Sequence, residues 1–516
     1  MQRRLWPFKG TEMKLSCCFA MAGAAAVGVL GLTGCTTLTP EAQTAALVAQ
    51  AEAAMGSAAL KTVTVSGHGS GASVGQAHAP GGAWPALQLT ALSRAMNFDT
   101  ASFREESIRS RSEPLGGGAV PLMGSGDARG VVLARENFAW DVAGTATVPA
   151  PAALPARVHD LWLTTPAGAI KVAAQMKARA GVRRDFLRRW DTLSFTLPGQ
   201  FSATLVLEDT GLISRIEASV PHAVLGAMPV VTQFLDYRPY RAYRNDGGLL
   251  MPARVVQQQG GFAALDLDVT AVAANEAVEI TVPDNVRAAT EAVSIEKVAD
   301  GVWFLAGGTH HSVAIEQVGQ IVLVELPLHA GRARAVLDAA NQLVPGKRVL
   351  TVINTHHHFD HAGGLRTAAA DGITLVTSAL ARPYLEAAFA GVAPGAPSRF
   401  VDVQTRAVLE DAVRPVEIHA LQDSIHAQGL LVVWLPREQL LVEADAYTPA
   451  AAPAAGALVA PPPAVPHFNP NPNPNHLNLV QNLDRLGLVP QFILPLHGRV
   501  VPAADLYVLV GRTPPP

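Results

Sequence analysis

The stretch THHHFDHAGG at residues 355–364 decides how this sequence is interpreted. It places four histidines and one aspartate within six consecutive residues. The apolar run 348–353 before it predicts a buried strand, and residues 365–370 after it predict a helix. The segment is internal and contains an aspartate and a glycine pair, which excludes an expression tag. Histidine and aspartate gathered at a strand-to-helix turn predict a metal site.

The spacing of these side chains predicts how they share the metal ions. Zinc prefers imidazole nitrogen and carboxylate oxygen, with about four ligands and an open position for water in catalytic sites. His356 and His358 are two residues apart in an extended loop, so both can reach one metal ion. Asp360 and His361 lie at the turn into the helix and can reach a second ion. His357 faces away by alternation and is not expected to be a ligand.

The motif resembles the HxHxDH signature of the metallo-β-lactamase superfamily at every ligand position. The resemblance covers residues 292–510 and implies an αββα sandwich. Within this range, the Pro/Asn-rich residues 449–474 predict an extended loop, which is either a disordered insertion or a rim or lid over the site. It implies two Zn²⁺ ions, with later residues completing the site. These are His426 as the third histidine of the first zinc, Asp445 as the carboxylate that bridges both metals, and His497 as the last histidine. Ala444 replaces the usual glycine before the bridging aspartate, and Glu325 replaces an aspartate often found on an early strand.

The resemblance implies a hydrolase that uses a metal-bound hydroxide on an ester, lactone, amide or related small molecule. Asp360 would orient the hydroxide and shuttle a proton. Two alternatives remain open, a mononuclear iron dioxygenase of the same fold and a non-catalytic envelope binding protein. His310 and His311, in a loop after a strand, are candidates for supporting or substrate-facing roles.

The first 35 residues resemble a bacterial lipoprotein signal. Four basic residues within positions 1–14 precede an uncharged apolar stretch, 17–32, that is shorter than the ~20 residues needed to span a bilayer. It ends in LTGC at 32–35, which resembles a lipobox, so we expect lipidation of Cys35 after a start at Met1 or Met13. Thr36 then implies a protein held by its lipid anchor at the periplasmic face of the envelope, on the outer membrane. An ordinary cleaved signal and a buried N-terminal helix are the alternatives.

Composition limits the rest of the molecule. The three cysteines all lie within residues 1–35, so a mature chain has no thiolate for a metal and no internal disulfide. The net charge of -3, without a long basic run, argues against nucleic acid as a partner. Residues 36–56 are expected to form a tether running into a short helix. Alternating apolar residues and turn signals then predict a mostly antiparallel β domain over 57–290, so the fold class is α+β.

Overall fold

The computed structural model describes residues 39–112, 116–118, 126–240, 248–390, 392, 399–449 and 472–515. The expected leader with Cys35 and most of the Pro/Asn-rich segment lie outside these residues. Pro40–Pro516 form one compact unit. Within the described residues, no helix is both long and apolar enough to cross a membrane.

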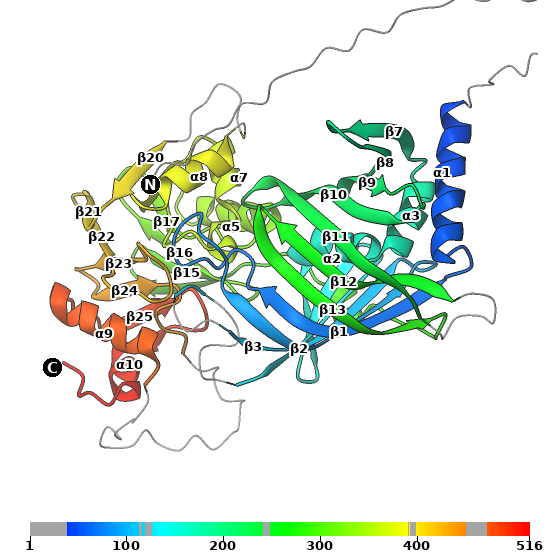
Figure 1. Cartoon of the computed structure of the whole chain (residues 1–516). Coiled ribbons are helices and arrows are strands. Elements are labelled where there is room, and N and C mark those ends of the chain that lie inside the picture. The colour runs from blue at the N-terminus through cyan, green and yellow to red at the C-terminus, as the bar shows by residue number, and fades with distance from the viewer. Residues whose placement is uncertain are drawn as a thin grey trace, which may run out of the picture. The chain divides into compact units, whose positions relative to one another are not determined.

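The N-terminal part forms a 13-stranded antiparallel sheet, called the large sheet below (Figure 1). Its strand order is β6-β5-β4-β3-β2-β1-β13-β12-β11-β10-β9-β8-β7, so the first and last strands pair with each other at its centre. The strands are β1 (Thr62–Ala72), β2 (Ala86–Asn97), β3 (Ser102–Arg111), β4 (Ala128–Arg135), β5 (Phe138–Ala143), β6 (Ala146–Pro149), β7 (Arg179–Arg184), β8 (Arg189–Leu197), β9 (Phe201–Leu207), β10 (Ile213–His222), β11 (Gly226–Tyr240), β12 (Leu249–Gln259) and β13 (Phe262–Ala274).

Helices pack against this sheet and fill its core. The buried apolar side chains of α1 (Pro40–Met55), α2 (Leu154–Leu163) and α3 (Pro166–Gln175) join those of the strands in one cluster. Short helical turns, η1 (Pro151–Ala153) and α4 (Asp284–Arg287), complete this part. Much of the segment expected to be a tether is therefore a packed helix, with Leu47, Ala51 and Met55 buried.

Two local predictions can be compared directly with this part. The turn at 209–211 predicts a hairpin, and β9 and β10 form it. In the sequence, Thr165, Pro166 and Gly181 predict a helix that Thr165 caps and Gly181 ends. The cap is confirmed, because the Thr165 hydroxyl accepts a hydrogen bond from Gly168 N. The predicted end of that helix at Gly181 is wrong. The helix ends at Gln175, and Gly181 belongs to β7, where it pairs with β8.

The C-terminal part is a sandwich of four layers. A seven-stranded sheet faces a six-stranded sheet, and buried aliphatic side chains from both fill the space between them. Helices α5, α7 and α8 cover the outer face of the first sheet, and α9 and α10 cover the outer face of the second. This is the αββα arrangement that the resemblance implied. Together the two parts give the α+β class.

The bounds of the sandwich elements follow the chain. The first sheet holds β14 (Ser294–Ala299), β15 (Val302–Ala306), β16 (Ser312–Glu316), β17 (Ile321–Val324), β18 (Val349–Ile353), β19 (Thr374–Ser378) and β20 (Phe400–Val403). The second holds β21 (Arg406–Leu409), β22 (Val416–Ala420), β23 (Leu431–Leu435), β24 (Leu440–Glu443), β25 (Phe492–Pro495) and β26 (Val501–Pro502). The helices are α5 (Ala330–Asn341), α6 (Phe359–Ala362), α7 (Leu365–Ala370), α8 (Arg382–Phe389), α9 (Pro474–Leu486) and α10 (Ala503–Leu509).

The end of the predicted Pro/Asn-rich loop differs by one residue from the structure. Pro474 is the first residue of α9, and the Asn473 side chain accepts a hydrogen bond from Asn475 N at the helix start. Proline suits this position because the first turn of a helix needs no N–H donor from it and its φ is already helical.

Candidate metal centre

The candidate ligands stand where strands of the sandwich end. His356 and His358 follow β18, and Asp360 and His361 lie on the short helix α6. Asp445 follows β24, and His497 follows the neighbouring parallel strand β25. His426 lies in the loop between β22 and β23. Strands fixed by the apolar core thus bring together side chains that are spread over residues 356–497 of the sequence.

Three imidazoles form the first group, called the three-histidine cluster. Ligand atoms of His356, His358 and His426 all lie within 4.8 Å of one another. The Nε2 atoms of His356 and His426 are 3.2 Å apart. Two nitrogens bound at ~2.0–2.1 Å to one tetrahedral zinc would lie about 3.3 Å apart, so this spacing fits a shared metal ion.

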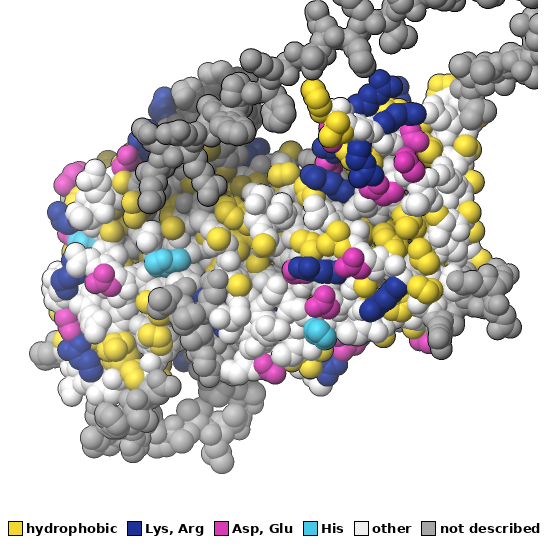
Figure 2. All heavy atoms as spheres, in the orientation of Figure 1, with side chains coloured by type: hydrophobic (Ala, Val, Ile, Leu, Met, Phe, Trp, Pro, Cys, Tyr) yellow, Lys and Arg dark blue, Asp and Glu magenta, His cyan; other side chains and the backbone are white. Residues whose placement is uncertain are grey.

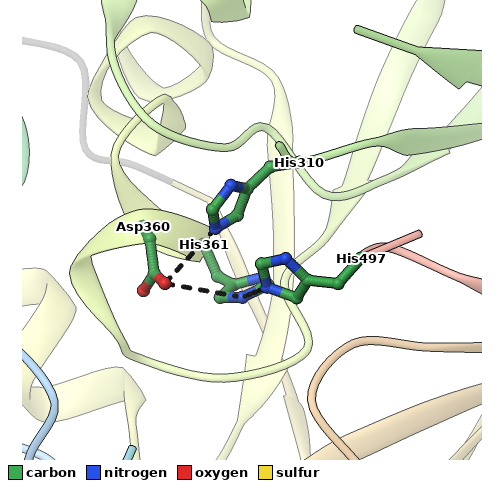
Figure 3. Close-up of side chains that lie close together, drawn as sticks. All are labelled: His310, Asp360, His361 and His497. Carbon is green, nitrogen blue, oxygen red and sulfur yellow. Dashed lines mark hydrogen bonds and ion pairs between the residues drawn. The ribbon is translucent and has the colours of Figure 1, made fainter. Parts of the chain in front are cut away.

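A second group, the mixed cluster, contains His310, Asp360, His361 and His497 (Figure 3). Figure 3 shows the side chains of His310 and His497, which come from two other segments, converging on Asp360 and His361 of α6. The Nε2 atoms of His361 and His497 are 3.0 Å apart, which again fits neighbouring ligands of one ion. Asp360 Oδ2 lies 3.3 Å from His310 Nε2 and 4.0 Å from His361 Nε2.

Asp445 connects the two clusters. Its Oδ2 atom lies 3.3 Å from His356 Nε2 and 3.5 Å from His426 Nε2 on one side. The same oxygen lies 2.7 Å from His361 Nε2, while Oδ1 lies 3.2 Å from His497 Nε2. Asp445 Oδ2 is buried and accepts no conventional hydrogen bond from the described residues. One carboxylate facing both groups is the position of a ligand that bridges two metal ions.

The hydrogen bond of His358 leaves its inner nitrogen free. His358 Nε2 donates to the carbonyl oxygen of Ala77 over 2.8 Å, which fixes the proton on Nε2. Nδ1 is then an unprotonated nitrogen, buried and without a hydrogen-bond partner among the described residues. A buried acceptor left unpaired costs free energy unless a ligand satisfies it. A metal ion bound by Nδ1 removes this cost.

Other imidazoles are oriented in the same way. His356 Nδ1 lies 3.0 Å from Thr355 Oγ1, and that hydroxyl lies 3.0 Å from the buried carboxylate of Glu325. Glu325 Oε2 is also 3.4 Å from His361 Nδ1. His497 Nδ1 donates to the backbone carbonyl of Thr309 over 3.1 Å. The contacts of His356 and His497 place the proton of each ring on Nδ1 and leave Nε2 facing the clusters.

Burial and neighbouring charges prepare the two clusters differently. Burial lowers the pKa of His356 and of His358 well below the usual value, so both are neutral at pH 7 and ready to bind a metal ion. Burial also opposes charge on His361, but the carboxylates of Asp445 and Asp360 outweigh it and raise the pKa of His361. A metal ion that binds the mixed cluster must therefore displace a proton from His361.

The large sheet takes part in this site through the loop that follows β1. Gln76 Nε2 donates to Asp360 Oδ1 over 2.8 Å, and Phe359 N donates to Gly75 O over 3.3 Å. His78 adds two contacts with the loop at 424–428: its ring Nε2 lies 2.9 Å from Ser424 O, and its carbonyl accepts from Gln428 N over 2.8 Å. The loop 73–78 is therefore attached to both sides of the metal centre.

A cavity of about 780 Å³ opens at the centre, with walls from both parts of the molecule. The large sheet and its loops contribute Ser73, Val74, Gln76, Arg109 and Gly118. The sandwich contributes Thr309, His310, Asp360, His426, Asp445, Thr448, Asn473, Asn475, His476 and His497. The position of a Cβ at Gly118 would lie 3.0 Å from the Cε1 atoms of both His358 and His426, so only glycine leaves these rings undisturbed. The volume suits a small molecule.

All seven sequence-predicted metal ligands meet at this place, while Cys35 lies outside the described residues. His357 joins neither cluster and donates to Ala77 O instead. Sequence reasoning missed His310 as a member of the mixed cluster, although its position after a strand marked it as a candidate for a supporting role. It missed Gln76 entirely, because nothing in the sequence connects residue 76 with residue 360.

Comparisons with known proteins give one family match and several similar structures. Residues 305–449 match the family model described as the metallo-beta-lactamase superfamily. Similar solved structures include the metallo-beta-lactamase from Pontibacter korlensis, with 18% identity and TM-score 0.33 over 42% of this chain and 97% of that one. The metallo-beta-lactamase from Hirschia baltica has 19% identity and TM-score 0.33 over 43% and 98%. Rubredoxin oxygen:oxidoreductase from Desulfovibrio gigas has 17% identity and TM-score 0.33 over 42% and 60%. Among curated proteins, no relative matches this sequence.

Proposed function

Because residues 305–449 match the model of the metallo-beta-lactamase superfamily, we propose that this protein is a zinc-dependent hydrolase of that superfamily. The observation that carries the proposal is the position of Asp445 Oδ2, within 3.5 Å of imidazole nitrogens from both clusters. Such an arrangement suits two metal ions. The donor set of imidazole nitrogen and carboxylate oxygen, without sulfur, suits zinc.

The residues divide the work of hydrolysis. When bound, two zinc ions supply a water activated at neutral pH and polarise the group under attack. His356, His358 and His426 would hold one ion, Asp360, His361 and His497 the other, and Asp445 both. Asp360 lies at the cavity with Oδ1 held by Gln76, so its carboxylate is oriented to accept a proton from the attacking water and deliver it to the leaving group. Esters, lactones and amides are the substrates that this chemistry serves.

The proposed location follows from the sequence. Lipidation of Cys35 would anchor the enzyme to the periplasmic face of the envelope, on the outer membrane. Hydrolysis would then act on small molecules in the periplasm.

The test begins with metal analysis of protein purified without a tag. We expect close to two zinc ions per chain. The zinc protein is then assayed with ester, lactone, amide, phosphodiester and sulfate substrates, beside Asp360→Ala and the matched surface variant Asp371→Ala, whose carboxylate pairs with Arg334. Hydrolysis should be lost in the first variant and kept in the second. Equal turnover in both variants contradicts the mechanism, and one iron ion with no hydrolysis would favour the dioxygenase alternative.

A further inference from the structure

Arg109 is a cation in the wall of the metal cavity that no described residue neutralises. It lies on β3 of the large sheet and lines the cavity with Asp360, Asp445 and His310. Its Nε atom is buried and has no hydrogen-bond partner. Other arginines of the same strand are paired: Arg104, for example, donates to Glu106 over 2.6 Å.

The charges of the cavity make this isolation informative. Arg109 is the only lysine or arginine among the described residues that line the cavity. The two carboxylates of the cavity, Asp360 and Asp445, contact the imidazoles of the metal clusters rather than Arg109. A guanidinium with a buried, unpaired N–H costs free energy, and an oxyanion bound beside it would accept that hydrogen bond.

We propose that Arg109 binds a carboxylate group of the substrate while the metal centre acts on another part of the same molecule. The proposal rests on the proposed function and narrows it to anionic esters, lactones or amides. A guanidinium presents a planar fork of donors that matches a carboxylate, so the residue would select anionic over neutral substrates. The N-terminal part would thereby set specificity for chemistry performed in the sandwich.

The experiment uses small thiols, which bind a metal centre whether or not a substrate is known. Protein loaded with Co²⁺ is titrated with ω-mercaptocarboxylates of two to six carbons and with the mercaptoalcohols of the same lengths. The thiolate-to-cobalt absorption band reports binding to the metal. We expect at least one mercaptocarboxylate to bind about tenfold or more tightly than its alcohol, since a charged hydrogen bond is gained.

Arg109→Ala should remove this preference and leave the affinity for the mercaptoalcohols unchanged, which also shows that the site remains folded. Arg109→Lys should keep part of the preference, and Arg104→Ala on the same strand should keep all of it. If the wild type binds each mercaptocarboxylate and the matching mercaptoalcohol with equal affinity, the role of Arg109 is wrong, although the metal centre is still supported. No absorption band with any thiol would instead contradict the metal centre itself.

A second, independent feature is the tip of the hairpin formed by β7 and β8. Phe186 and Leu187 are 103% and 89% exposed there. The tip is closed by a hydrogen bond from Asp185 N to Arg188 O, and the Asp185 side chain accepts from Leu187 N and Arg188 N over 2.9 and 2.8 Å. Short hairpin loops usually carry glycine or asparagine, so two large apolar residues at this tip need another explanation.

Basic residues surround the exposed pair. Residues 179–191 contain five arginines and two aspartates. Figure 2 shows basic and hydrophobic side chains together where Figure 1 places β7 and β8. Three of these arginines pair with carboxylates, whereas Arg179 and Arg184 form no ion pair with the described residues. Apolar side chains on a basic element are suited to an anionic lipid surface.

The start of α1 lies beside this hairpin. Ala180 N donates to Thr44 Oγ1 over 3.1 Å. In the sequence, Pro40 lies five positions after the proposed anchor Cys35, which allows a reach of at most about 17 Å. We propose that the 185–188 tip inserts Phe186 and Leu187 into an anionic membrane surface and so sets the orientation of the anchored enzyme.

Vesicle sedimentation tests this with the compact unit 40–516, which contains every core cluster and lacks the apolar leader. Vesicles of phosphatidylglycerol and phosphatidylcholine should bind it, and phosphatidylcholine alone should bind it more weakly. Phe186→Ser with Leu187→Ser should reduce binding about tenfold or more, whereas Val318→Ser, at an apolar residue 58% exposed elsewhere, should not. No binding by the wild type, or equal binding by the tip variant, overturns the proposal and leaves the tip to a protein partner.

Discussion

The sandwich and the large sheet contribute to the metal centre in different ways. The sandwich supplies every side chain of the two clusters and the Asp445 carboxylate that lies between them. The large sheet and its loops supply the groups around these side chains. The Ala77 carbonyl accepts hydrogen bonds from Nε2 of His357 and of His358, and the Gln76 amide donates to Asp360. The large sheet also forms one wall of the cavity.

This difference shows that the ligand motif describes only part of the site. In many metal sites the groups behind the ligands are worth 10–100-fold in metal affinity or activity. Here some of those groups come from a sheet some 280 residues earlier in the sequence. The comparison therefore predicts that changes in the large sheet, far from the motif, will affect the metal centre.

The largest effect is expected within the sandwich. Asp445→Asn replaces the carboxylate that faces both clusters with a neutral amide, so both metal ions should bind more weakly, by more than about 100-fold. Metal content after dialysis against a weak chelator measures this. Asp371→Asn, at a surface ion pair with Arg334, is the matched control and should keep full metal content. If the Asp445 variant kept both ions, the bridging role would be wrong.

A change in the large sheet should come next. Gly75 has φ +78°, and a methyl group there would overlap the Phe359 ring. Gly75→Ala should therefore push the 73–78 loop away from the ligand loop, weaken metal binding about tenfold and destabilise the protein by about 2 kcal/mol. Gly199→Ala is the matched control, because Gly199 has φ +72° and no atom lies within 4 Å of the position of its Cβ. Metal affinity and urea midpoints that are the same in both variants would count against a shared site.

A smaller effect is expected from a single hydrogen bond. Gln76→Ala leaves Asp360 Oδ1 without its 2.8 Å donor, so turnover should fall about tenfold while the zinc of the three-histidine cluster stays bound. Steady-state kinetics and metal content measure the two effects. Gln88→Ala, which removes an exposed bond to Gly69 O in the same sheet, should change neither. Unchanged turnover in the Gln76 variant would show that the hydrogen bond from Gln76 to Asp360 does not contribute to catalysis.

The last effect concerns stability alone, at the contact between the two parts. Burial lowers the pKa of His222 to about 4, and its ring packs against Phe359. The unfolded chain takes up a proton at His222 near pH 6.5, whereas the folded protein does so only near pH 4. The stability that the neutral ring contributes is therefore present above pH 6.5 and is lost as the pH falls toward 4. The loss attributable to this residue at pH 5 is about 2 kcal/mol.

His222→Asn keeps an acceptor for the N–H groups of Val224 and Leu225, which donate to His222 Nδ1. Urea unfolding at pH 7 and pH 5 should show a smaller drop in the variant than in the wild type. All other titratable groups are the same in both proteins, so the difference between the two decreases in the free energy of unfolding isolates His222. Equal drops would mean that His222 is protonated alike in both states.

Much of the fold was predictable because its signals are local. The apolar run before the motif marks β18, and the turn at 209–211 marks a hairpin. The end of α3 at Gln175 was not predictable. Residues 179–184, which the sequence assigned to the end of this helix, form β7 and pair with β8, and that pairing depends on the partner strand rather than on helix propensity. The short helix expected within residues 36–56 is α1, but its length and its packing were not predictable, because its Ala-rich sequence has no strong apolar face.

The sequence by itself determined which side chains could hold the metals. Few residue types offer nitrogen or oxygen donors to zinc, and strands with apolar patterns place those residues at their ends. Only the tertiary structure decided which carboxylate oxygen faces both clusters, where the proton of each imidazole lies, and that the large sheet forms a wall of the cavity. These depend on separations of a few ångströms between residues hundreds of positions apart, which no local pattern encodes.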